Sequence, residues 1–211
     1  MIEKLHYISQ AGEKGTHLEA IEEVLRSGGT WIQLRIKEQA MEDILKIAQE
    51  AVALCKPYGA KLIVNDYPEI AKKSGADGVH LGLDDMPIAA ARALLGKDKI
   101  IGGTANTFAH IQQRISEGVD YIGLGPFRFT QTKKNLSPLL GMEGYRAIMA
   151  QVKAYRLQIP IIAIGGIRPD DVGAIVDLGI HGVAVSAALT ENASILTEIH
   201  QTLKIRTQQI C

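Results

Sequence analysis

Short apolar runs alternate with longer amphipathic runs along the whole chain. The apolar runs are rich in Val, Ile and Leu, which predicts buried strands, and the amphipathic runs predict helices. The predicted strands are residues 5–9, 31–37, 61–66, 78–82, 100–104, 121–125, 161–167 and 182–186. A run such as Ile161-Ile162-Ala163-Ile164 has no polar face. We therefore expect a parallel sheet that is covered by helices.

Glycine and proline mark the boundaries of these predicted units. Glycines at positions 28–29, 59, 75, 96, 118 and 179 close the helix-like runs, and Pro68, Pro87 and Pro169 open three others. Eight units in 211 residues leave about 26 residues each, and this total suits a minimal eight-stranded barrel. We predict an α/β fold, a (β/α)8 TIM barrel in which residues 1–211 form a single domain. The alternative is an open, doubly wound parallel sheet.

The charge balance excludes some classes of function. Lys plus Arg and Asp plus Glu are both 23, so the chain lacks the basic excess expected of a nucleic-acid-binding protein. The first ten residues contain Glu3, Lys4 and His6 instead of a signal-peptide core, and no apolar run approaches the roughly 18 residues of a membrane span. The two cysteines, Cys55 and Cys211, predict neither a disulfide nor a zinc site. We expect a cytoplasmic protein that binds no nucleic acid and no membrane, and a homo-oligomer stays open.

Candidate chemistry gathers at the carboxyl ends of the predicted strands. In the run from residue 31 to 37, Gln33, Arg35 and Lys37 alternate, which would place all three on one inward face of a strand. Unpaired cations in a barrel interior cost several kcal/mol or more to desolvate. The pattern therefore predicts an anionic ligand at this position.

Two pairs of acidic or amide residues lie at the next strand ends. Asn65-Asp66 closes the third predicted strand, and Asp84-Asp85 follows the fourth. Adjacent strands lie about 4.8 Å apart, so carboxylates from both could share one cation. Mg²⁺ commonly takes one or two protein carboxylates and completes its shell with water and phosphate oxygens. We predict a magnesium-diphosphate site; the alternative is that each aspartate only caps the following helix.

The last two predicted strands indicate a second anion site. Gly165-Gly166 follows the seventh strand and Ser186-Ala187 the eighth, where barrels of this type often bind phosphate through main-chain N–H groups. Tight packing is the alternative explanation for the glycines. The stretch 127–141 is long for a strand-to-helix loop, which favours a functional loop over a tolerated surface insertion.

Several spaced motifs in one order make the chain similar to a known family. They are Gln33-Leu34-Arg35-Ile36-Lys37, Val64-Asn65-Asp66, the stretch 78–85 (GVHLGLDD), the stretch 120–126 (DYIGLGP), the stretch 130–134 (TQTKK) and Ala163-Ile164-Gly165-Gly166-Ile167. Over nearly its whole length the chain resembles the thiamine-phosphate synthases, which are (β/α)8 barrels.

The resemblance implies a transferase of thiamine biosynthesis. Its reaction would be the Mg²⁺-dependent condensation of 4-amino-2-methyl-5-hydroxymethylpyrimidine diphosphate with thiazole phosphate, giving thiamine monophosphate and diphosphate. The partners would thus be two small phosphorylated heterocyclic substrates. No protein nucleophile is required for this chemistry.

The resemblance also implies roles for individual residues. The pyrimidine diphosphate would be bound by Gln33, Arg35, Lys37, Asn65, Thr104 and Lys133, of which Arg35, Lys37 and Lys133 would be catalytic. Asp66 and Asp85 would hold the magnesium ion. The thiazole phosphate would be bound by Thr130, Gln131, Thr132, Gly166, Ser186 and Ala187. His80 would lie under the pyrimidine, or would be a packed and hydrogen-bonded histidine.

Some positions depart from the family pattern. Leu83 stands where the family usually has Gln, and Thr104 replaces the usual Ser but keeps a hydroxyl. The stretch 127–129 (FRF) replaces an aliphatic-aromatic-Pro run, and Ser186-Ala187 stands where Ile-Ser is common. Leu83 and the arginine of that stretch bear on substrate selectivity.

Three other functions compete with the synthase. A thiazole tautomerase shares the barrel and the phosphate site but uses no metal-bound diphosphate. The chain has residues suited to such a diphosphate, which argues against the tautomerase: Asp66, Asp85, Arg35, Lys37 and Lys133. A Schiff-base aldolase needs an imine-forming lysine, and the stretch 121–126 contains none. A non-catalytic, phosphate-ligand-binding barrel would need neither the two aspartates nor Lys133.

Overall fold

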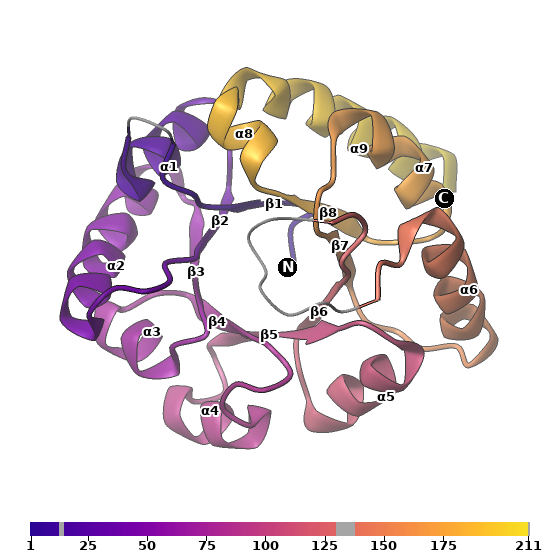
Figure 1. Ribbon diagram of the computed structural model, residues 1–211, viewed down its shortest axis with the longest axis horizontal. Helices are drawn as coiled ribbons and strands as arrows, with labels where there is room; N and C mark the ends of the chain where they lie inside the picture. The colour runs from indigo at the N-terminus through magenta and orange to yellow at the C-terminus, as the bar shows by residue number, and fades with distance from the viewer. Residues whose placement is uncertain (13–14, 130–137, 211) are drawn as a thin grey trace.

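Eight parallel strands close into a barrel in the computed structural model, which describes residues 1–12, 15–129 and 138–210 (Figure 1). The strands pair in sequence order, and β8 returns to pair with β1. They are β1 (Leu5–Ile8), β2 (Trp31–Leu34), β3 (Lys61–Asn65), β4 (Gly78–Leu81), β5 (Ile100–Ala105), β6 (Tyr121–Leu124), β7 (Ile161–Ile164) and β8 (Gly182–Val185). The predicted TIM barrel is confirmed, and the open sheet is excluded.

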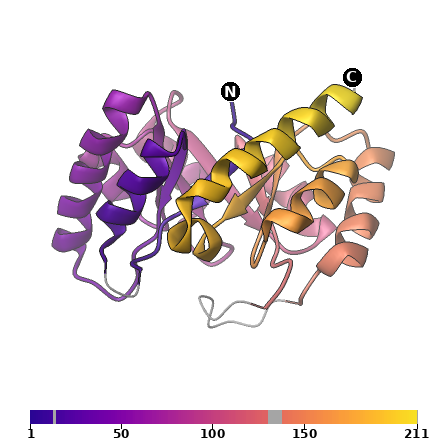
Figure 2. The same cartoon turned by 90° about the horizontal axis from the view of Figure 1, so that it is seen from above.

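A ring of helices covers the outside of the barrel (Figures 1 and 2). They are α1 (His17–Arg26), α2 (Met41–Cys55), α3 (Pro68–Ser74), α4 (Ile88–Leu95), α5 (Phe108–Glu117), α6 (Gly141–Ala154), α7 (Val172–Asp177), α8 (Ala187–Glu191) and α9 (Leu196–Ile210), with short 3-10 turns at Lys56–Tyr58, Pro169–Asp171 and Ala193–Ile195. The last helix, α9, packs beside α7.

Local sequence signals explain where many helices begin and end. Thr16 caps α1 by accepting a hydrogen bond from the Glu19 N–H at 3.2 Å, and the Glu19 carboxylate accepts one from the Thr16 N–H at 2.7 Å. Gly75 and Gly118 end α3 and α5 with φ of +80°, a left-handed conformation that suits glycine. Pro68 opens α3, as predicted from the sequence.

The end of β2 differs from the prediction. The strand ends at Leu34, whose partner on β3 is Val64, so Arg35 and Lys37 lie in the following loop and not on the strand. Ile36 between them is buried, so the alternation of inward and outward side chains continues beyond the last paired residue. Periodicity alone could not locate the end of β2, because a strand ends where its hydrogen-bonded pairing with the neighbouring strand stops.

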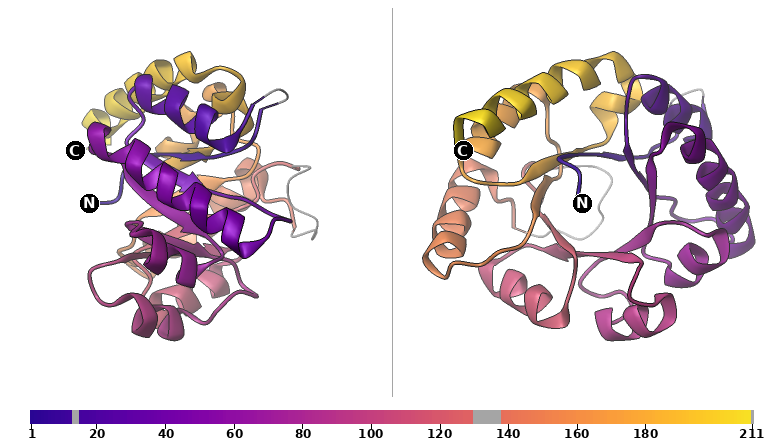
Figure 3. Two further views of the ribbon diagram at one scale, coloured as in Figure 1. Left: turned by 90° about the vertical axis from the view of Figure 1, so that its left-hand side faces the viewer. Right: turned by 180° about the vertical axis from the view of Figure 1, so that it is seen from behind.

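The barrel interior is a packed core. Trp31, Ile63, Tyr121 and Ile162 fill it from four strands, and the His6 ring stacks on Trp31 with the ring centroids 4.4 Å apart. The residues near the N-terminus lie at the amino-terminal mouth of this core (Figure 3), where the Ile2 carbonyl accepts a hydrogen bond from the His181 ring at 3.0 Å. In barrels of this fold, active sites lie at the opposite, carboxyl-terminal end of the strands.

Within the described residues, no helix has the length and apolar character that a membrane crossing requires. The cytoplasmic location and the single-domain boundary at residues 1–211 stay predictions.

Candidate active site

The carboxyl ends of β2 and β3 bring two predicted ligand-binding amides together. The Gln33 side chain donates from Nε2 to Asn65 Oδ1 at 2.7 Å, and both residues are buried. This bond orients both amide groups, which fixes the donors and acceptors left for a ligand.

Asp66 is held in an uncommon backbone conformation at the end of β3. Its N–H donates to the His80 carbonyl at 2.9 Å, and its φ is +66°, a left-handed value that costs a non-glycine residue roughly 1–2 kcal/mol. The turn brings the Asp66 carboxylate to 3.0 Å from the Lys37 ammonium. Lys37 is therefore paired within the protein, whereas the sequence predicted a cation that needs an external anion.

A second carboxylate meets Asp66 from the loop after β4. Asp85 Oδ2 accepts a hydrogen bond from the Gly82 N–H at 2.6 Å, and the Asp66 carboxyl lies near enough to Asp85 to affect its pKa. Burial, and then the neighbouring Asp66, raise the pKa of Asp85 above its usual value. Two carboxylates so placed share either a proton or a cation.

This donor set fits a magnesium ion. Mg²⁺ needs only one or two protein carboxylates when phosphate and water supply the remaining oxygens. Among the described residues, no group of three or more His, Cys, Asp or Glu side chains is arranged to hold a metal ion. The raised pKa of Asp85 is expected where two carboxyl groups lie close together, and a bound cation would reduce the repulsion between their charges.

Arg35 lies beside this pair and is positioned by residues that the sequence analysis did not single out. The main-chain N–H of Arg35 donates to Ser9 Oγ at 3.2 Å, and Ser9 Oγ is hydrogen-bonded to the His17 ring at 2.8 Å. Burial lowers the pKa of the Arg35 guanidinium, although Asp66 opposes the shift. Burial, and then the charge of Arg35, lower the pKa of His17.

His80 connects two side chains at the centre of the barrel. Its Nδ1 is hydrogen-bonded to the Tyr121 hydroxyl at 3.0 Å and its Nε2 to Thr104 Oγ1 at 3.1 Å. Glycines give the ring its space, since a Cβ at Gly102 would lie 2.5 Å from His80 Nδ1 and one at Gly123 would lie 2.9 Å from His80 Cε1. The packed, hydrogen-bonded histidine of the sequence analysis is thus confirmed.

Two glycines shape the second predicted anion site, after β7. Gly165 and Gly166 have φ of +98° and +69°, and a Cβ at Gly165 would lie 2.8 Å from Pro126 Cα. Both conformations favour glycine. Because Ile164 pairs with Ala184, the residues that follow β7 and β8 lie side by side.

Side chains around these glycines are already engaged within the protein. Ser186 Oγ donates to the Ile8 carbonyl at 2.6 Å. Arg128 Nη1 donates to the Gly166 carbonyl at 3.0 Å, and the guanidinium forms a two-pronged pair with Asp171. The sequence marked Arg128 only as a departure and missed Asp171.

Four predicted residues cannot be placed beside these. Thr130, Gln131, Thr132 and Lys133 lie outside the described residues. All the other predicted site residues lie at or just beyond the carboxyl ends of β2, β3, β4, β5, β7 and β8.

A sequence profile described as thiamine monophosphate synthase matches residues 5–189. The chain belongs to this family. It is 48% identical over 192 residues to the thiamine-phosphate synthase of Flavobacterium johnsoniae, covering 91% of each chain. It is 46% identical to that of Bacteroides fragilis, covering 95% of this chain and 98% of the relative. The family resemblance deduced from the motifs is confirmed, and the chain is a transferase.

The solved structures agree with this family. A thiamine phosphate pyrophosphorylase from Pyrococcus furiosus superposes with a TM-score of 0.81 at 29% identity, covering 98% of this chain and 96% of that one. A phosphoribosylanthranilate isomerase from the same organism reaches a TM-score of 0.66 at 12% identity, a likeness that concerns the fold alone.

Proposed function

We propose that this member of the thiamine monophosphate synthase family joins the pyrimidine diphosphate to the thiazole phosphate, forming thiamine monophosphate and releasing diphosphate. The observation that carries the proposal is the grouping of Asp66 with Asp85, whose pKa it raises, with Lys37 at 3.0 Å from Asp66 and Arg35 alongside. A tautomerase or a simple phosphate-binding barrel has no need of this arrangement.

In this proposal the diphosphate leaves first. The bond between the pyrimidine methylene carbon and the diphosphate oxygen breaks, and its electron pair departs with the diphosphate. The lone pair of the thiazole nitrogen then forms the new C–N bond to that carbon. Charge on the departing diphosphate is stabilised by Arg35, Lys37 and Lys133, and the Gln33–Asn65 pair orients the pyrimidine.

Asp66 and Asp85 would hold Mg²⁺ at the diphosphate. The ion, when bound, supplies Lewis-acid stabilisation of the leaving group, an effect worth several kcal/mol. Lys37, which pairs with Asp66 at 3.0 Å, would then be free to turn toward the diphosphate oxygens.

The thiazole phosphate would occupy the second site. Main-chain N–H groups of Gly166, Ser186 and Ala187 would bind its phosphate, together with Thr130, Gln131 and Thr132. This division leaves the thiazole ring between the two sites, in line with the methylene carbon. We place the reaction in the cytoplasm, with two small phosphorylated heterocycles as partners and no nucleic acid or membrane.

The neighbouring aspartates of one loop provide a matched test. Asp85→Asn should lower turnover by orders of magnitude, because it removes a carboxylate from the cation site, whereas Asp84→Asn, at an exposed position, should behave as wild type. Product formation from the two phosphorylated heterocycles is followed by chromatography, with and without EDTA. Lys133→Ala should also lower turnover strongly. Near-normal kinetics in Asp85→Asn, or activity that resists EDTA, would contradict the metal-diphosphate assignment.

A further inference from the structure

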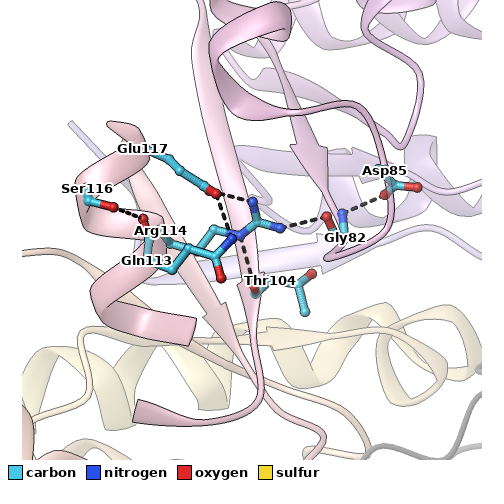
Figure 4. Close-up of polar contacts among 7 residues, drawn as sticks. All are labelled: Gly82, Asp85, Thr104, Gln113, Arg114, Ser116 and Glu117. Carbon is cyan, nitrogen blue, oxygen red and sulfur yellow. Dashed lines mark hydrogen bonds and ion pairs between the residues drawn. The ribbon is translucent and has the colours of Figure 1, made fainter. Parts of the chain in front are cut away.

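Arg114 is a buried arginine on α5 that reaches the carboxyl ends of two strands (Figure 4). Its side chain is only 4% exposed. The guanidinium donates from Nε to the Thr104 carbonyl at 3.1 Å and from Nη2 to the Gly82 carbonyl at 2.7 Å. One side chain thus connects the end of β5 to the loop that follows β4.

The surroundings of Arg114 are built to hold its charge. Glu117, one turn further along α5, accepts from Nη1 at 2.7 Å, which supplies the partner that a buried cation needs. The planar guanidinium donates to three acceptors in different directions, and the single ammonium group of a lysine could not reproduce this geometry. Gly103 makes room, since a Cβ there would lie 2.8 Å from Arg114 Cδ.

The two carbonyls lie where the pairing of β4 with β5 ends. Leu81 and Gly103 form the last residue pair between β4 and β5, and Gly82 and Thr104 directly follow them in the sequence. The Arg114 guanidinium therefore links the main chains of the two segments just beyond their last pair. Gly82 in turn donates its N–H to Asp85 Oδ2 at 2.6 Å, and Thr104 carries the hydroxyl predicted to meet the pyrimidine diphosphate.

We propose that Arg114 is a positioning residue for the metal-diphosphate half of the site, an inference that rests on the proposed function. By fixing the Gly82 and Thr104 carbonyls, it sets where Asp85 and the Thr104 hydroxyl stand relative to one another. Arg114 contacts neither substrate itself. The second anion site, after β7 and β8, contains none of its partners, so the effect is confined to one substrate.

Two substitutions of Arg114 test this directly. Arg114→Lys keeps the positive charge but loses the planar guanidinium, and Arg114→Met removes both. Replacing a group that orients a metal ligand typically costs about 10–100-fold in metal affinity. We therefore expect the Kd for inorganic pyrophosphate with MgCl₂, measured by titration calorimetry, and the half-saturating Mg²⁺ concentration to rise about tenfold or more. The KM for thiazole phosphate should stay within about twofold.

Arg92 provides the matched control. It lies on the neighbouring helix α4 and donates to the Lys99 carbonyl at 2.5 Å and to the Asp120 carboxylate at 2.7 Å, but these partners precede β5 and β6 at the amino-terminal end. Arg92→Met should leave the pyrophosphate Kd and both KM values unchanged. If Arg92→Met raised the pyrophosphate Kd as much as the Arg114 variants do, the effect would come from a general loss of fold stability, and the proposal would be overturned.

Other results for the Arg114 variants and the wild-type protein distinguish a failure of the positioning role from a failure of the proposed function. Irreversibly misfolded protein lowers the number of active sites but leaves Kd and KM unchanged, urea unfolding shows whether a variant is fully folded under the assay conditions, and Arg114→Lys provides the measurement if Arg114→Met does not fold. An unchanged pyrophosphate Kd in a folded Arg114 variant, or an equal rise in the KM of both substrates, overturns the positioning role. A wild-type protein that forms no thiamine phosphate or binds no magnesium pyrophosphate would contradict the proposed function itself.

Discussion

A buried histidine near the amino-terminal end of the barrel should make the stability of this protein depend on pH. His6 is 1% exposed, its ring stacks on Trp31, and its Nε2 donates to the Glu3 carbonyl at 2.9 Å. Burial lowers its pKa from 6.5 to about 3, although the hydrogen bond to Glu3 opposes the shift. We predict that His6→Phe, which keeps an aromatic ring but cannot take up a proton, removes this dependence.

The size of the effect follows from the two pKa values. In the unfolded chain His6 binds a proton near pH 6.5, whereas in the folded protein it does so only near pH 3. Folding therefore favours the neutral ring, so the contribution is complete above pH 6.5 and is lost as the pH falls from 6.5 toward 3. Linkage gives a loss of about 2 kcal/mol between pH 7.5 and pH 5.

Urea unfolding at these two pH values measures the difference. With a denaturant dependence of about 2 kcal/mol per molar urea, the wild-type midpoint should fall by about 1 M more than that of His6→Phe. The variant should be about 1 kcal/mol less stable at pH 7.5, because it loses the bond to Glu3. His17 and His200, whose pKa values burial also lowers, are present in both proteins and cancel. Equal falls in the two midpoints would refute the reasoning.

Two further substitutions test the packing and the second anion site. Gly102→Ala should destabilise the protein by about 1–3 kcal/mol in urea unfolding, since its Cβ would lie 2.2 Å from the Tyr121 ring, and wild-type stability would contradict this close packing. Arg128→Met should raise the KM for thiazole phosphate about tenfold, because it releases the Gly166 carbonyl, while the KM for the pyrimidine diphosphate stays unchanged in steady-state assays. A matching rise in both values would show that Arg128 acts on the whole barrel.

Features of the fold with local causes could be predicted from the sequence. Gly75 and Gly118 end helices because each adopts a left-handed φ of +80°, and this requirement is visible in the residue type alone. The end of β2 could not be found in this way. The alternation through Arg35 and Lys37 continues after the last β3 partner of the strand, and pairing is a property of two segments.

The same distinction applies to the candidate site. Asp66 and Asp85 could be predicted to lie close together because adjacent parallel strands bring their carboxyl ends together, and Asp66 is near enough to raise the pKa of Asp85. Arg114 could not be predicted, because with Glu117 it has the spacing of an ordinary exposed ion pair on a helix. The available signal was Gly102-Gly103 inside a predicted strand, since glycine there marks a close approach of other atoms.

The packing of the barrel separates its stability from its chemistry. His6, Trp31 and Tyr121 contact one another inside the barrel, whereas the predicted ligand-binding groups project from the strand ends and loops above them. His80 joins the two regions, because it bonds Tyr121 below and Thr104 above. A change at His6 should therefore alter unfolding while leaving the KM for both substrates unaltered, provided that Tyr121 still holds the His80 ring in place.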